Sequence, residues 1–393
     1  MTDLPIPQTD PRAGYLERRA EIDAAIARVL LAGQYILGHE VEAFETAFAA
    51  WLGSAHAIGC GSGTDALELA LRACGIGQGT KTGDLVFTVS HTAVATVAAI
   101  ERAGAVPVLV DIEPGGFTMD PAALETALRD PPPGRPAAIL PVHLYGEPAD
   151  LSPILDLARR HGLRVIEDCA QSHGALYRGR PAGRFGDIAC FSFYPTKNLG
   201  ALGDAGITAT DDPALAAALR EIREYGWRER YVSARPGINT RLDALQAAIL
   251  AAKLPHLAAD NARRQAIAAR YDTGLAGLPL ARPGRRAACG PVFHQPVFHQ
   301  HVFHQHVFHQ YVIRCRDRDG LREHLRQAQI ATGIHYPLPV HLQPAFRDRL
   351  GQYPAALPET ARAMHEILSL PIYPQLGAAA VERVVAEIRR FFA

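Results

Sequence analysis

Two residues about thirty positions apart carry the chemistry of a paired amine and carboxylate. Asp168 follows a short apolar run, residues 163–166, which reads as a buried strand, and α/β folds hold ligands at strand ends. Lys197 lies in a stretch where Pro195 and Gly200 disfavour a continuous helix or strand. A lysine enclosed in such a loop can lose its proton and attack a carbonyl carbon. The pair therefore predicts carbonyl chemistry next to a buried negative charge.

The two side chains match what pyridoxal phosphate (PLP) requires of a protein. A lysine bonds to the aldehyde of PLP, and a carboxylate keeps its ring nitrogen protonated. Taken singly, Asp168 could cap a helix and Lys197 could be a solvated loop lysine. The surrounding residues favour the PLP interpretation, because they form one longer pattern of polar, aromatic and glycine positions. That pattern consists of Asp168, Gln171, Gly174, Ser192, Phe193, Lys197, Gly200, Gly203, Asp204 and Gly206.

This pattern resembles the hallmark segments of the sugar-nucleotide aminotransferases of the DegT/StrS type, a branch of the fold-type I PLP enzymes. The resemblance extends from near Pro7 to the C-terminus. It implies that PLP is joined to Lys197 and that Asp168 pairs with the ring nitrogen. Lys197 then serves as general base and acid once it is released. The resemblance also implies that Gln171 contacts the 3-hydroxyl of the cofactor.

A glycine-rich turn, residues 59–63, independently indicates an anion site. A short strand over residues 56–60 leads into it, and a helix over residues 66–73 follows, with Thr64 or Asp65 as N-cap. Backbone N–H groups and the helix dipole bind anions at such a position. The glycine spacing could also indicate a dinucleotide fold, but no acidic residue ends a strand about twenty residues later.

The resemblance assigns this turn to the phosphate of PLP. The phosphate-binding residues that it implies are Gly63, Thr64, Ser192 and Asn239. Asn239 lies in a Gly-Ile-Asn-Thr-Arg segment, residues 237–241, which resembles the family segment that reaches into a neighbouring subunit. A homodimer with shared active sites is therefore expected.

One departure from the family pattern concerns the face of the cofactor ring. Many relatives place an aromatic residue directly after the threonine matched by Thr92, whereas this chain has Ala93. His91 is the nearest planar side chain, and we expect it to cover the ring. The alternative is a histidine at a helix N-terminus that faces solvent.

Two segments offer groups for an anionic substrate that carries a ring. Residues 225–231 are rich in aromatic and arginine side chains, although a solvated loop with two packed rings would read the same way. Residues 335–342 form a proline-stiffened loop that resembles the substrate-side loop of the family. The expected substrate-binding residues are Tyr194, Tyr225, Arg228, Tyr231, His335, Tyr336 and His341.

The elements that position these residues follow an α/β pattern. Apolar runs at 56–60, 84–89, 106–110, 137–144 and 163–166 alternate with helical patterns, which predicts right-handed βαβ units. With 393 residues the chain is too long for one ordinary core. The resemblance implies a fold-type I arrangement. Its large PLP-binding domain, residues 1–255, holds a mostly parallel seven-stranded sheet and N-terminal helices, and a smaller C-terminal α+β domain spans residues 256–393.

Residues 291–310 are a tandem repeat of four five-residue units, two Pro-Val-Phe-His-Gln followed by two His-Val-Phe-His-Gln. A strand of about twenty residues would span about 66 Å, which is too long for this sheet. We expect one unit to form a strand, as part of the run that leads into residues 311–314, and the others to form a loop or hairpin. The six histidines could bind a metal, but duplication of a coding segment gives histidines without a designed geometry, and we expect no metal.

The composition excludes several classes of partner. Positive and negative side chains balance to a net charge of zero, which gives no basic field for nucleic acid or an anionic membrane. No apolar run reaches the length of a membrane span, and Met1 to Arg12 lacks a signal-peptide core. Six scattered cysteines without a Cys-x-x-Cys pair favour the reducing cytoplasm.

The resemblance implies an aminotransferase that moves an amino group from L-glutamate to a nucleotide-linked ketosugar. Residues 143–146, 193–203 and 335–342 most resemble enzymes that make 3-amino-3,6-dideoxy sugars on dTDP. UDP-linked 3-keto or 4-keto sugars are the alternative acceptors. A PLP-dependent sugar dehydratase of the same family would carry histidine in place of Lys197. A non-enzymatic PLP-binding regulator would lack that lysine or add a DNA-binding domain.

Overall fold

A seven-stranded sheet forms the centre of the molecule. The computed structural model describes residues 4–77, 83–283, 304–350 and 357–393. The strand order is β1-β9-β8-β5-β4-β2-β3; β9 runs antiparallel to both of its neighbours and the remaining pairs are parallel. The strands are β1 (His56–Cys60), β2 (Asp84–Val89), β3 (Val106–Val110), β4 (Arg135–Ile139), β5 (Arg164–Asp168), β8 (Ile188–Ser192) and β9 (Gly206–Thr210). This mostly parallel sheet confirms the predicted fold class.

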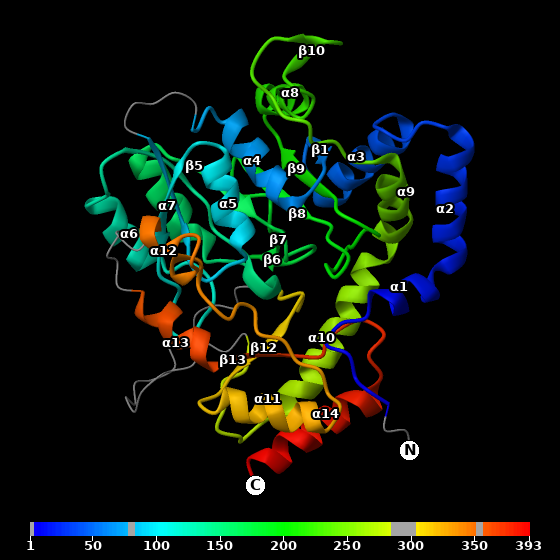
Figure 1. The fold of residues 1–393 in the computed structure, drawn as a ribbon, viewed down its shortest axis with the longest axis vertical. Coiled ribbons are helices and arrows are strands. Elements are labelled where there is room, and N and C mark those ends of the chain that lie inside the picture. Colours follow the sequence, from blue (N-terminus) through cyan, green and yellow to red (C-terminus); the bar gives the residue numbers. More distant parts are fainter. Residues whose placement is uncertain (1–3, 78–82, 284–303, 351–356) are drawn as a thin grey trace.

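Helices cover the sheet and continue into a smaller C-terminal part. The helices of the large part are α1 (Pro11–Glu17), α2 (Arg19–Ala32), α3 (His39–Leu52), α4 (Gly63–Ala73), α5 (Val94–Arg102), α6 (Pro121–Arg129), α7 (Leu151–His161), α8 (Pro213–Ile222) and α9 (Ala244–Lys253). Those that follow are α10 (Leu257–Gly274), α11 (Arg318–Gln327), α12 (Arg347–Leu350), α13 (Pro358–Glu366) and α14 (Ala378–Phe391). In Figure 1, α10 runs from the large part down to the small one.

Short strands and turns complete the fold. They are the hairpins β6 (Leu176–Tyr177) with β7 (Arg180–Pro181) and β10 (Trp227–Glu229) with β11 (Val232–Ser233), the pair β12 (Tyr311–Arg314) with β13 (Ile367–Leu370), and the 3-10 turns η1 (Leu144–Gly146), η2 (Leu254–His256) and η3 (Val340–Leu342). β4 ends at Ile139, so the predicted strand over 137–144 is too long at its C-terminal end. Pro141 follows, and the chain turns into η1.

Separate apolar clusters stabilise the two parts. The sheet and its flanking helices bury one large cluster that includes Leu69, Phe87 and Ile166. A second cluster joins α10, β12, β13, α11 and α14. Ile6 belongs to this second cluster and bonds through its main chain to Gln329 and Ala331. The predicted division at 255/256 falls at η2 and stays a prediction, but the N-terminal segment packs with the C-terminal core.

The last repeat unit is not the strand that we expected: residues 306–310 are irregular, and the strand β12 begins only after them. Gln305, just before this unit, forms an isolated bridge with Leu176. Residues 291–303 of the repeat lie outside the described residues. Among the helices that the structure describes, none combines the length and apolarity of a membrane span.

Candidate active site

Most of the predicted cofactor residues gather in one cavity of about 230 Å³. It lies at the C-terminal ends of β5 and β8, beside the N-terminus of α4, where α/β sheets hold ligands. The predicted residues that line it are Gly63, Thr64, Asp168, Gln171, Ser192, Tyr194 and Lys197. The other lining residues are Ser62, Leu67, Thr92, Ala93, Ala95, Thr96, Val142, Ala170 and Asp204.

The glycine-rich turn forms the anion-binding end of this cavity. Ser62, rather than Thr64 or Asp65, is the N-cap of α4, and its hydroxyl accepts a bond from the Asp65 N–H. A Cβ at Gly63 would lie 2.5 Å from the Cβ of Ser192, so the glycine lets the turn approach β8. The first turn of α4 leaves backbone N–H groups without intrahelical partners, and they favour an anion together with the helix dipole. This end fits the phosphate of PLP.

Asp168 supplies a buried carboxylate to the same cavity. The side chain is 4% exposed, and its two oxygens accept bonds from the Ala170 N–H (3.1 Å) and the Thr96 hydroxyl (2.9 Å). Burial raises the pKa of Asp168, while these bonds and the charge of Lys197 act in the opposite direction. A cationic ring nitrogen in the cavity would also lower the pKa of Asp168, against the effect of burial, and would keep the carboxylate ionised.

Thr96 is a functional residue that the sequence analysis did not single out. Its hydroxyl lies 3.0 Å from that of Thr92, and both line the cavity. Thr96 lies in the first turn of α5 and Thr92 precedes its N-cap Ala93, so the two hydroxyls meet where the chain enters the helix. The available signal was a pair of threonines four residues apart in a mostly apolar stretch.

An internal polar anchor fixes the strand that carries Asp168. Glu167 accepts bonds from the main chain of Gly183, Phe185 and Gly186 and from His143 Nε2, at 2.7–3.1 Å. His143 Nδ1 accepts a bond from the Ala149 N–H, so Nε2 carries the proton. Burial acts to raise the pKa of Glu167, but its bonds to His143 and the main chain hold that pKa below its usual value.

The same anchor forms the one group of possible metal ligands among the described residues. The ligand atoms of His143, Glu167 and Cys169 lie within 4.8 Å of one another. Those of His143 and Glu167 already bond to each other and to the main chain. We therefore interpret the group as a support for Asp168.

Lys197 lies in a closed loop between β8 and β9. The loop is tied by main-chain bonds from Lys197 to Tyr194 (2.8 Å) and from Ala201 to Phe193 (2.7 Å). A Cβ at Gly200 would lie 2.4 Å from the Pro195 carbonyl oxygen, so this loop requires glycine there. Burial lowers the pKa of Lys197 to about 8, against the opposing effect of Asp168. The neutral, nucleophilic amine is therefore accessible near physiological pH.

The 335–342 loop reaches the rim of the cavity through Gln171. Gln171 accepts a bond from the Tyr145 N–H (2.7 Å) and donates one to the Tyr336 hydroxyl (3.2 Å). Burial raises the pKa of Tyr336 to about 12. His335 Nδ1 lies 2.8 Å from the Ser369 hydroxyl.

His341 extends the contact between this loop and the large part. Its Nδ1 lies 2.6 Å from the hydroxyl of Ser90, which also accepts a bond from the His341 N–H. The loop is thus anchored beside the cavity. Substrate contacts by His335, Tyr336 and His341 stay a prediction.

His91 lies away from the cavity. It is 1% exposed, its Nε2 lies 2.9 Å from the Tyr145 hydroxyl, and its ring stacks on Phe117 with centroids 5.9 Å apart. Burial lowers the pKa of His91 to about 4. Ala93 lines the cavity instead. This geometry does not support the prediction that His91 covers the ring of the cofactor, because Tyr145 and Phe117 hold the histidine in the core.

Four predicted residues lie beyond this cavity, on the segment after α8. Tyr225 and Tyr231 are 42% and 71% exposed, and Arg228 pairs with Glu221 at 3.0 Å. Asn239 is exposed and bridges to Glu224. The β10 hairpin projects from the body at the top of Figure 1. None of these residues lines the cavity of its own chain.

These features define the class of the site. A buried carboxylate, a lysine of lowered pKa and a helix N-terminus share one cavity, and this donor set fits PLP. When bound, PLP supplies an electron sink for negative charge that develops on carbon next to an amine. The site and the sheet together are those of a fold-type I PLP enzyme.

Comparison with known proteins identifies the family. The sequence profile of the DegT/DnrJ/EryC1/StrS aminotransferase family matches residues 17–389. The chain belongs to this family and is a PLP-dependent aminotransferase.

Several relatives are similar over nearly their whole length. The "Erythromycin biosynthesis sensory transduction protein EryC1" of Saccharopolyspora erythraea is 46% identical, over 98% of this chain and 99% of its own. A dTDP-3-amino-3,4,6-trideoxy-alpha-D-glucose transaminase of Streptomyces venezuelae is 45% identical, over 98% and 96%. A UDP-N-acetyl-3-dehydro-alpha-D-glucosamine 3-aminotransferase of Acidithiobacillus ferrooxidans is 42% identical, over 98% and 97%.

A similar solved structure is that of Streptomyces venezuelae DesV in complex with a ketimine intermediate. It has 45% sequence identity and a TM-score of 0.88, with 98% of both chains covered.

Proposed function

We propose that this enzyme transfers an amino group from L-glutamate to a ketosugar linked to a nucleotide. The preferred acceptor is a dTDP-3-keto-6-deoxyhexose, which becomes the 3-amino sugar. The observation that carries the proposal is the shared cavity of Lys197 and Asp168 at the N-terminus of α4. Two relatives of 45% and 42% identity are named as aminotransferases for a dTDP-linked and a UDP-linked amino sugar, and these names support the acceptor class.

Lys197, Asp168 and the phosphate-binding end of the cavity each have a task in the proposed reaction. Lys197 binds the cofactor in the resting enzyme and moves a proton from the α-carbon of the amino donor. Asp168, held by Thr96 and Ala170, balances the positive ring nitrogen. The α4 N-terminus and Ser192 hold the phosphate so that the reacting carbon stays next to the lysine.

The exposed β10 hairpin supports a homodimer with shared active sites. Tyr225, Arg228, Tyr231 and Asn239 lie away from the cavity of their own chain, on a projecting element. In a two-fold dimer one patch serves both subunits, so such an element can complete the partner's site. Arginine pairs well with the diphosphate of a sugar nucleotide, and the tyrosines offer faces for its base.

Three alternatives to this function are less well supported: a dehydratase, a regulatory protein and an aminotransferase for a UDP-linked sugar. A sugar dehydratase of this family would replace Lys197 by histidine, which has no primary amine to bond to PLP. A purely regulatory role, which the names of two relatives suggest, does not explain a lysine of lowered pKa in one cavity with a buried carboxylate. A UDP-linked 3-keto sugar is the serious competitor for the dTDP sugar, because a relative of 42% identity is named for that reaction.

A substrate panel tests the proposal. The purified enzyme is incubated with glutamate and, in separate tubes, with 3-keto and 4-keto sugars linked to dTDP or UDP, and the products are identified by mass spectrometry. We expect amination of the dTDP-linked 3-keto sugar. Amination only at C4, or only of a UDP sugar, would refute the proposed acceptor but would leave the aminotransferase activity supported. Loss of a hydroxyl without gain of nitrogen refutes the aminotransferase itself.

A further inference from the structure

The loop that carries Lys197 is tied at two points to one helical stretch. Asn198, directly after the lysine, donates to Asn261 Oδ1 at 2.8 Å. At the other end of the loop, the Gly200 carbonyl accepts a bond from Lys253 Nζ. Lys253 ends α9 and Asn261 lies in the second turn of α10, so a continuous run of helix holds both ends.

Asn261 connects the lysine loop to the segment after Asp168. It is 4% exposed, and its Nδ2 donates to the His173 carbonyl at 2.8 Å. A Cβ at Gly174 would lie 2.8 Å from this Nδ2, and the φ of Gly174 is +85°. Glycine is therefore required for the approach of Asn261. One amide thus fixes the distance between the two segments that carry Lys197 and Asp168.

The last repeat unit supplies the other acceptor of Asn198. Asn198 Nδ2 also donates to the Val307 carbonyl at 3.0 Å. Arg264 donates to the carbonyls of Phe308 and Ile372 at 3.1 Å each, and Gln265 donates to that of His306 at 3.0 Å. Every one of these contacts is to a main-chain oxygen. The unit is thereby held against α10 as a fixed support under the lysine loop.

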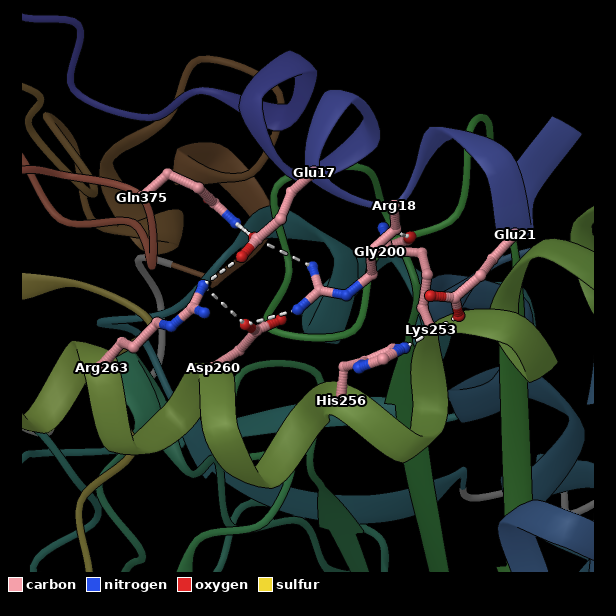
Figure 2. Close-up of polar contacts among 9 residues, drawn as sticks. All are labelled: Glu17, Arg18, Glu21, Gly200, Lys253, His256, Asp260, Arg263 and Gln375. Carbon is pink, nitrogen blue, oxygen red and sulfur yellow. Dashed lines mark hydrogen bonds and ion pairs between the residues drawn. The ribbon is translucent and has the colours of Figure 1, made fainter.

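The N-terminal helices lock α10 in place, as Figure 2 shows. Arg18, between α1 and α2, pairs with Asp260 at 2.8 Å, and both side chains are nearly buried. Glu17 accepts bonds from Arg263 and Gln375 at 2.6 Å each. These pairs lie within one turn of Asn261, so they resist rotation of α10 at that position.

Packing alone does not fill the space beneath the loop. A polar cavity of about 50 Å³ lies there, lined among others by Lys197, Lys253 and Asp260. Leu199 and Ala201 of the loop pack in the core, but directed bonds hold the side of the loop that borders this cavity. Loss of about 1 Å of precision at a reacting group costs much of the rate.

We propose that Asn261 is a positioning residue for Lys197, acting through Asn198, and that Lys253 holds the other end of the same loop. The proposal rests on the assignment of Lys197 as the lysine that bonds to the cofactor. It does not depend on which sugar is the substrate.

The test measures Lys197 directly in the full-length chain freed of PLP. Acylation of Lys197 is followed by peptide mass spectrometry across pH in the wild type and in Asn261→Ala and Lys253→Met. Burial lowers the pKa of Lys197 to about 8, so the wild-type profile should have its midpoint there. Both variants should loosen and hydrate the loop and move the midpoint up by about one pH unit. Arg270→Ala, which removes an exposed pair with Glu382 farther along α10, should leave the midpoint in place.

The outcomes are distinct from those of the substrate panel, because the labelling needs neither PLP nor sugar. Melting temperature and circular dichroism identify the variants that fold. A folded Asn261→Ala protein with the wild-type midpoint overturns the proposal. If Asn261→Ala does not fold, the decision passes to Lys253→Met, and an unchanged midpoint there overturns it equally.

Discussion

Replacement of Thr96 by valine should weaken the site through Asp168 while keeping its shape. The change removes the hydroxyl that donates to the Asp168 carboxylate at 2.9 Å and replaces it with a methyl group of similar size. A hydrogen bond to a charged group contributes about 1.5–3 kcal/mol. That corresponds to a rise of about one to two units in the pKa of Asp168, because one unit is about 1.36 kcal/mol.

The pH dependence of this effect has a definite sign. Burial already raises the pKa of Asp168, so the ionised carboxylate opposes folding of the cofactor-free chain at neutral pH, and protonation relieves it as pH falls. Thr96→Val should raise that pKa further. The loss of unfolding free energy caused by Thr96→Val should therefore be greatest at pH values above the pKa of Asp168 in both the wild type and the variant. The loss should become smaller as the pH falls through these two pKa values.

Urea denaturation of the cofactor-free proteins, at equal protein concentrations and at two pH values, measures the unfolding free energies that check this prediction. Thr92→Val is the matched control, because its hydroxyl contacts Thr96 rather than the carboxylate. We expect a loss of about 1.5–3 kcal/mol for Thr96→Val at neutral pH and a smaller loss at acidic pH. The affinity for PLP should fall about tenfold or more, since the pair with the ring nitrogen weakens. Equal losses at the two pH values, or equal losses in the two variants, would refute the reasoning.

Three further predictions concern the partner subunit, the repeat and the lysine. Mixing inactive Lys197→Ala with inactive Asn239→Ala subunits should restore part of the activity, whereas verified mixed dimers without activity would contradict a shared site. Deletion of residues 296–310 leaves one Pro-Val-Phe-His-Gln unit before Tyr311, and kinetic assays should show near-normal turnover. The remaining unit can take the place of residues 306–310, because Asn198, Arg264 and Gln265 bond only to main-chain oxygens there, and shortening a long connection costs little entropy. Collapse of activity, or loss of a tightly held metal, would show that the extra histidines matter. Attachment of PLP to the cofactor-free chain should accelerate as pH rises toward about 8, the lowered pKa of Lys197, and then level off, and a rate independent of pH would exclude a rate-limiting neutral amine.

The parts of the site that depend on local sequence were predictable. Asp168 ends a buried strand, Lys197 lies in a loop closed by glycine, and Gly63 lies in a glycine-rich turn between a strand and a helix, so each position follows from neighbouring residues. The helix itself begins three residues earlier than predicted. Strand ends of one sheet meet at one edge, and the cavity gathers these residues there.

Other features depend on contacts between distant segments, which local patterns do not encode. Thr96 matters because α5 turns it toward Asp168, and His91 leaves the cavity because Tyr145 and Phe117 hold it in the core. The support of Asn198 by Asn261 joins residues 63 positions apart. The role that we propose for Asn239 involves a second copy of the chain.

Transfer of labelled nitrogen tests the central claim most directly. The enzyme is loaded with PLP, reacted with ¹⁵N-glutamate in the absence of acceptor, separated from free glutamate, and then mixed with the dTDP-linked 3-keto sugar. The account predicts one 2-oxoglutarate per active site in the first step and a ¹⁵N-labelled 3-amino sugar in the second, as a ping-pong reaction requires, with neither product from Lys197→Ala. Release of 2-oxoglutarate only when the sugar is present, or label in the product of Lys197→Ala, would contradict it.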